Sequence, residues 1–244
     1  MNIIIDEVTH KELQKYVIET IEFGSTMKGT STVNSDHDYL HIIYPSSTWQ
    51  KSPVNTNHLL QYKDDGADHI YCDPVNFVKC LLDGDSTIFH EMLRYNVLND
   101  TCISFLNKYK FEHYKTLRAY LGIARRDLKE VSKLFNNNEV KSRKKLNFAI
   151  ESHNYVCEVL NATQRQYTLP MINTIHDLRV VLSSVQKSLD ILRNDINLKL
   201  QSGTISRTIS KEELHDIQSE LNAFNVAFYS SGLSFFYDSH ILGN

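Results

Sequence analysis

The chain lacks several features that would assign it to a protein class at once. Its 244 residues include four cysteines, Cys72, Cys80, Cys102 and Cys157, and none has the CxxC spacing of zinc or redox motifs. We therefore expect free, mostly buried thiols in a reduced, cytoplasmic protein. No apolar stretch approaches the ~20 residues that span a bilayer. The N-terminus lacks a basic segment followed by a long apolar run, so we expect no signal peptide and no membrane partner.

The sequence also contains no internal repeat and no low-complexity tract. Its charge is unevenly distributed, because residues 1–110 carry 9 Lys and Arg against 15 Asp and Glu. Residues 111–244 carry 17 against 14, and most of that basic excess lies between residues 113 and 166. An acidic half beside a basic half suits a metal site that faces a phosphate-bearing ligand. Solvated helix faces are the alternative interpretation.

The first half of the chain has mixed helix and strand patterns. A Thr-x-x-Glu capping box from Thr9 to Glu12 predicts a helix start. Short apolar runs predict four strands, at residues 19–23, 36–44, 59–62 and 68–72. The sequence Asp64-Asp65-Gly66 provides hairpin turn chemistry between the last two strands, and residues 49–57 are interpreted as a connecting loop.

Two helices are predicted next, and only helices after them. Asp73 as N-cap and Pro74 at the first position open a helix that Gly84 ends, and another begins near Ser86. From His113 onward the periodicity predicts helices near 113–135, 141–161, 174–200 and 210–229. We therefore predict an α+β domain over residues 1–110 and a helical domain over residues 111–244.

Gly24-Ser25 and Asp36-His37-Asp38 form the most informative pattern. Gly24 has no side chain to obstruct a phosphate, and Ser25 adds a hydroxyl and a backbone N–H, at the start of either a loop or a short helix. Asp36 and Asp38 are two residues apart on an expected strand, so both side chains should share one face, with His37 on the other. Neighbouring carboxylates are costly unless a cation lies between them.

A third carboxylate would complete a two-metal site, and Asp68 and Asp73 are the candidates. Asp73 already has a structural explanation as the cap before Pro74. Asp68 opens a strand and has none, so we favour Asp68 as general base or metal ligand.

The stretch from Phe23 to Asp38 resembles the signature of the DNA polymerase β-like nucleotidyltransferase superfamily, in particular a group of predicted nucleotidyltransferases from bacteria and large phages. That signature is an apolar residue, Gly-Ser, a spacer, and Asp-x-Asp on a strand. Asp68, Phe77 and Glu91 follow in the order that this group shows. Weaker similarity continues at Tyr120, Gly122 and Lys144. The chain departs from the group at Met27, Phe148 and Glu151.

The resemblance implies a small mixed sheet with flanking helices, followed by a helical domain, in the cytoplasm of a bacterium or a phage-infected host. It implies a nucleoside triphosphate as substrate and Mg²⁺ or Mn²⁺ as cofactor. Asp36, Asp38 and Asp68 would hold metal and act in catalysis, and Gly24 and Ser25 would contact the β- and γ-phosphates. The acceptor hydroxyl stays open between RNA, protein and a small molecule.

Two lysines are further candidates for phosphate binding. Lys28 follows the Gly-Ser pair, although a solvated lysine is an equal interpretation. Lys144 belongs to a basic cluster that opens a helix, where positive charge opposes the helix dipole and so hints at an anionic partner. The alternative function is a catalytically inactive nucleotide- or partner-binding protein of the same fold.

Overall fold

The computed structural model describes residues 2–33, 35–44, 59–135, 137–162, 167 and 175–230. The chain divides into two compact units, one comprising Met1–Lys110 and Ser210–Asn244, the other Phe111–Ile209. The division after residue 110 lies where the sequence changes character. The last helix, α8 (Lys211–Ser230), however, belongs to the first unit and not to the helical one. It buries Ile217 and Leu221, and Lys108 Nζ lies 3.0 Å from the Glu220 carboxylate.

Five strands form one mixed sheet in the order β1-β4-β5-β3-β2. The strands β1 and β4 pair in parallel, as do β3 and β5, whereas β2–β3 and β4–β5 are antiparallel. Four strands agree with the sequence patterns, and β1 was not anticipated. Asp36 precedes β3, so the strand prediction was wrong for this residue. The strand bounds are β1 Asn2–Ile4, β2 Val17–Phe23, β3 His37–Ile43, β4 Leu59–Lys63 and β5 Ala67–Cys72.

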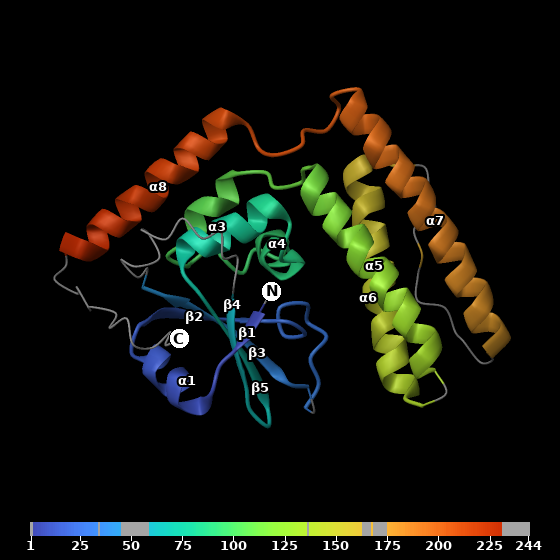
Figure 1. Ribbon diagram of the computed structural model, residues 1–244, viewed down its shortest axis with the longest axis horizontal. Coiled ribbons are helices and arrows are strands. Elements are labelled where there is room, and N and C mark those ends of the chain that lie inside the picture. The colour runs from blue at the N-terminus through green and yellow to red at the C-terminus, as the bar shows by residue number, and fades with distance from the viewer. Residues whose placement is uncertain are drawn as a thin grey trace. The chain divides into compact units, whose positions relative to one another are not determined.

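Helices lie on both sides of this sheet, as the α+β prediction requires. The helix α1 (Glu7–Gln14) lies on one side, and α3 (Pro74–Asp83) and α4 (Thr87–Arg94) lie on the other (Figure 1). Leu13 of α1 packs with Ile43, Leu60 and Tyr71, whose side chains share one face of the sheet. A short 3₁₀ helix, η1 (Ser104–Lys108), follows α4 along the chain.

Local capping chemistry determines where these helices begin and end. Asp73 caps α3 by accepting hydrogen bonds from the backbone N–H groups of Val75 and Asn76, and Gly84 ends the helix at φ 67°. Both assignments confirm the sequence prediction. The capping box was wrong, because Asp6 is the N-cap of α1 and its carboxylate accepts from the Thr9 N–H at 2.8 Å. Helix α1 therefore begins before Thr9.

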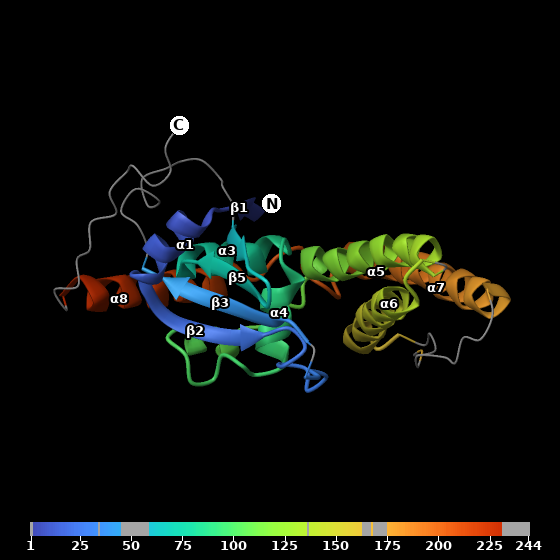
Figure 2. The same ribbon diagram turned by 90° about the horizontal axis from the view of Figure 1, so that it is seen from below.

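The second unit is formed by α5 (Tyr114–Leu134), α6 (Glu139–Leu160) and α7 (Ile175–Gln201), which share one apolar core (Figure 2). The expected stripe on α7 contributes four buried side chains, Leu178, Val185, Leu189 and Leu192. The expected loop at 49–57 lies outside the described residues. None of the helices in the described ranges has the length and apolarity needed to cross a membrane.

Candidate active site

A row of candidate side chains crosses three strands, β4, β5 and β3, near the start of β3. Lys63 on β4 pairs in register with Asp68 on β5, and Asp68 pairs with Asp38 on β3. Asp38 in turn pairs with Phe23, the last residue of β2 before Gly24. Residues in register on neighbouring strands point to the same face of a sheet. The sheet therefore brings two of the three predicted acids together, beside the predicted glycine.

Position 24 requires glycine, because the Asp38 carboxylate lies against the backbone there. Its backbone has φ 68°, in the region that favours glycine. A Cβ added to Gly24 would lie only 1.9 Å from Asp38 Oδ2 and 2.9 Å from Asp38 Cγ. Any side chain at this position would have to displace the carboxylate. The spacing between Gly24 and Asp38 in the sequence thus corresponds to direct contact in the fold.

Asp68 is held by two side chains from the neighbouring strand. The Gln61 amide donates to both carboxylate oxygens, at 2.6 Å and 2.8 Å, and Lys63 Nζ donates to Oδ2 at 2.5 Å. The Asp68 side chain is 21% exposed and that of Lys63 is 60% exposed. Asp68 is therefore a hydrogen-bonded carboxylate at the edge of solvent.

Asp36 and Ser25 lie on less regular backbone than expected. Asp36 is exposed in the segment before β3, so strand alternation does not fix the direction of its side chain. The residues after Ser25 form turns and not a helix, with the Thr30 N–H donating to the Ser25 carbonyl at 2.9 Å. The segment after Ser25 is therefore a loop and not a short helix.

Lys28 links the Gly-Ser loop to α4. Its ammonium lies 3.1 Å from the Glu91 carboxylate, and the two side chains are 12% and 18% exposed. The interpretation of Lys28 as a solvated lysine was therefore wrong. Because this pair is largely removed from solvent, it constrains the loop more than an exposed pair would.

Lys144 lies in the second unit, whereas the other candidate residues lie in the first. Together with Lys141, Lys145 and Phe148 it lines a cavity of about 400 Å³, and its Nζ lies 5.9 Å from the Phe148 ring centre. Lys145 is bound to Asp127 and Glu130, and Arg143 to Glu139. Part of the basic cluster thus has a structural explanation, which weakens the inference of an anionic partner.

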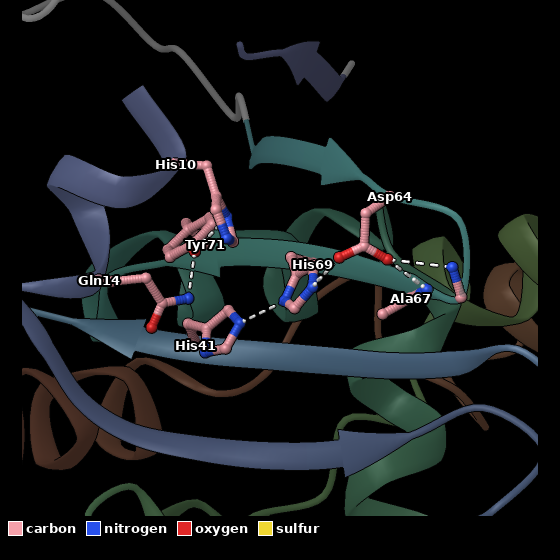
Figure 3. Close-up of polar contacts among 8 residues, drawn as sticks. His10, Gln14, His41, Asp64, Ala67, His69 and Tyr71 are labelled. Carbon is pink, nitrogen blue, oxygen red and sulfur yellow. Dashed lines mark hydrogen bonds and ion pairs between the residues drawn. The ribbon is translucent and has the colours of Figure 1, made fainter. Parts of the chain in front are cut away.

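The opposite face of the sheet carries a network of histidines and tyrosines (Figure 3). His41 Nε2 and His69 Nδ1 are 2.9 Å apart, and His69 Nε2 lies 3.4 Å from Asp64 Oδ2. His37 also faces this side, as predicted, with Nδ1 2.9 Å from the Glu22 carboxylate. Two further bonds join α1 to the network: the Tyr71 hydroxyl lies 2.8 Å from His10 Nδ1 and accepts from Gln14 Nε2 at 2.6 Å.

Burial keeps three groups of this network, His10, His41 and Tyr71, in their neutral forms near neutral pH. Burial first, and then the neighbouring His69 and His10, lower the pKa of His41 to about 4. Burial and His69 also lower the pKa of His10, and burial raises the pKa of Tyr71 to about 12. Buried, neutral His41 on this face therefore contrasts with the partly exposed Asp68 on the other.

Sequence reasoning missed Gln61 and Lys63 as partners of Asp68, and the whole histidine network. The hairpin offered a signal for Lys63, since a turn at Asp64-Asp65-Gly66 brings this residue opposite the start of the next strand. The network offered only a pattern of alternate His and Tyr residues on two strands that are far apart in sequence.

No protein-family model matches the chain, and no curated protein matches it in sequence.

Proposed function

We propose that the protein is a metal-dependent nucleotidyltransferase. It would transfer a nucleoside monophosphate from a nucleoside triphosphate to an acceptor hydroxyl and release pyrophosphate. The observation that carries the proposal is the contact between Gly24 and Asp38, with Asp68 in register beside Asp38. This arrangement supports the proposal because it puts the glycine turn against Asp38, one of two acids in register on neighbouring strands.

The donor set at this site suits a hard divalent cation. Within the residues that the structure describes, no three His, Cys, Asp or Glu side chains form a group that could hold a metal ion. Mg²⁺, however, is usually bound by one or two carboxylates together with substrate phosphates and water, and not by a complete protein cage. Asp38 and Asp68 provide two such carboxylates, and Asp36 would be the third ligand.

The remaining residues would position the triphosphate. The backbone N–H groups of the turn at Gly24 and Ser25 would donate to phosphate oxygens, and Ser25 would contribute a hydroxyl. The ion pair between Lys28 and Glu91 would hold this loop against α4. When bound, Mg²⁺ would neutralise the phosphates and lower the pKa of the acceptor hydroxyl. Most of the rate enhancement would come from positioning and electrostatic stabilisation.

A second candidate function is nucleotide or partner binding without catalysis. It is favoured by one observation, the full set of hydrogen bonds that Gln61 and Lys63 make to Asp68. A carboxylate engaged in this way is a less available metal ligand, because a cation must compete with these donors for its oxygens.

The test is transfer of label from each α-³²P-labelled nucleoside triphosphate in the presence of Mg²⁺ or Mn²⁺. RNA, a protein mixture and small hydroxyl compounds would be offered as acceptors. Asp38→Asn and Asp68→Asn are the test variants. Asp65→Asn is the matched control, because Asp65 is an exposed acid in the turn of the same hairpin.

Each outcome decides between the candidates. Transfer that requires Asp38 and Asp68 but not Asp65 supports the enzyme. Nucleotide binding without transfer in any acceptor mixture favours the non-catalytic function. A parent protein that neither transfers label nor binds nucleotide rules out the enzyme and leaves only partner binding for the second candidate.

A further inference from the structure

We infer that Lys63 is a built-in competitor of the divalent cation for Asp68, so that metal binds well only together with nucleotide. This inference rests on the proposed function, because it concerns the same pair of carboxylates. It adds a residue, Lys63, to the three predicted acids, and a direction in which its removal changes metal affinity.

The hydrogen bonds at Asp68 leave little capacity for another ligand. Oδ1 accepts from Gln61, and Oδ2 accepts from both Gln61 and Lys63. A cation that binds Oδ2 must therefore displace the Lys63 ammonium or share the oxygen with it. Two positive charges this close repel each other, which lowers the affinity for the metal.

The ion pair is also weak enough to be exchanged. The Lys63 side chain is 60% exposed, and exposed pairs between lysine and a carboxylate contribute little net stability. Lys63 has a flexible side chain and a point charge that binds phosphate oxygens readily. Nucleoside triphosphate would bring the acceptors that the displaced ammonium needs, so metal and nucleotide should bind with positive coupling.

The order of residues across the sheet explains why a positive charge lies beside Asp68. Asp38 and Asp68 are in register on adjacent strands, and Lys63 is the next residue in the same row. Lys63 offsets one of two neighbouring negative charges that would otherwise repel each other. It does so from a strand position, which fixes it beside Asp68 and on the far side from Asp38.

Mn²⁺ affinity, measured by electron paramagnetic resonance with and without a non-hydrolysable nucleoside triphosphate analogue, tests the inference. The variant is Lys63→Met. The matched control is Lys11→Met, since Lys11 is also exposed and also bound to a carboxylate, Glu7 at 2.6 Å, but lies on α1. A third protein combines Lys63→Met with Asp68→Asn, to show whether the effect acts through Asp68.

We expect Lys63→Met to bind Mn²⁺ about tenfold more tightly than the parent protein without nucleotide, and to lose most of the tightening that the analogue produces. Lys11→Met should leave both values unchanged, and the gain should vanish in the double variant. Equal or weaker Mn²⁺ binding by Lys63→Met, in a parent that does bind, overturns the inference and leaves the proposed function standing. If neither the parent nor Lys63→Met binds Mn²⁺ with or without the analogue, both fail.

Discussion

The two faces of the first unit's sheet are made by alternate residues of the same strands, yet they differ in chemistry. On one face, Asp38, Asp68 and Lys63 are in register on three neighbouring strands. The Asp68 and Lys63 side chains, which form an ion pair, are both partly exposed to solvent. On the other face, His41 and His69 are hydrogen-bonded to each other, and burial lowers the pKa of His41 to about 4, so that His41 stays neutral near pH 7. A one-residue step along β3 or β5 moves from one chemistry to the other.

The difference suggests separate tests for the proposed function, at Asp38 and Asp68, and for stability, at His41 and Tyr71. Charged groups at a solvent edge contribute little to folding but bind ions and phosphates. Buried, mutually satisfied polar groups fix a structure and are costly to disrupt. We therefore expect substitutions of Asp38 and Asp68 to affect ligand binding and transfer, and substitutions of His41 and Tyr71 to affect stability.

The largest expected effect comes from Gly24→Ala on the acidic face. The new Cβ would push the Asp38 carboxylate out of place, since Asp38 Oδ2 lies 1.9 Å from the Cβ position. A displacement of about 1 Å in a catalytic group costs roughly 100-fold in rate. The rate of label transfer by Gly24→Ala, compared with that of the parent protein, measures this loss.

Gly29→Ala is the control for that experiment. Gly29 has φ 65°, so alanine there carries the same backbone strain, but no atom lies within 4 Å of its Cβ position. It should lose about 1 kcal/mol of stability and keep its transfer rate within about twofold. Equal loss of activity in both variants would show that backbone strain, and not contact with Asp38, is responsible.

The next effect concerns the histidine face and pH. His41 has an ordinary pKa of 6.5 when unfolded and about 4 when folded, so the unfolded state takes up the proton first as pH falls. The neutral histidine therefore stabilises the fold fully above pH 6.5, and this contribution is lost progressively towards pH 4. Between pH 7 and pH 5 the loss should be about 2 kcal/mol.

Chemical denaturation of the parent and His41→Gln across this pH range measures that difference. The parent should lose about 2 kcal/mol more than the variant on going from pH 7 to pH 5, and the exposed His215→Gln should follow the parent. Parallel curves for the parent and His41→Gln would mean that His41 does not resist protonation in the folded protein.

Local chemistry in the sequence predicted those parts of the molecule that depend on near neighbours. Asp73, Gly84 and the hairpin turn at Asp64-Asp65-Gly66 are of this kind, because their hydrogen bonds reach only two to five residues along the chain. Strand β1 was missed because it has three residues and pairs with β4, nearly 60 positions away. Its pairing has no local signal.

The candidate site could also be predicted only in part from the sequence. Gly24 and Asp38 were identified from their spacing, and the fold brings them into contact. The partners of Asp68 and of Lys28 depend on strand register and on the position of α4, which the sequence pattern did not specify. The acids were therefore found, whereas the side chains that neutralise and position neighbouring groups were not.

A smaller effect should follow from Tyr71→Phe, which removes the hydroxyl that joins α1 to the histidine face. Gln14 and His10 lose one hydrogen bond each, but both reach solvent, so water can replace the hydroxyl. We expect a loss of about 1 kcal/mol in the free energy of unfolding and unchanged label transfer. A reduced transfer rate at unchanged stability would break the separation between the two faces.

The most direct test of the central claim compares two adjacent residues on opposite faces of β3. Isothermal titration calorimetry would measure binding of a non-hydrolysable nucleoside triphosphate with Mn²⁺ to the parent protein, to Asp38→Asn and to His37→Gln. The account predicts that His37→Gln binds like the parent and that Asp38→Asn binds at least about tenfold more weakly, a difference of about 1.4 kcal/mol. Equal binding by all three proteins, or no binding by the parent, would contradict it.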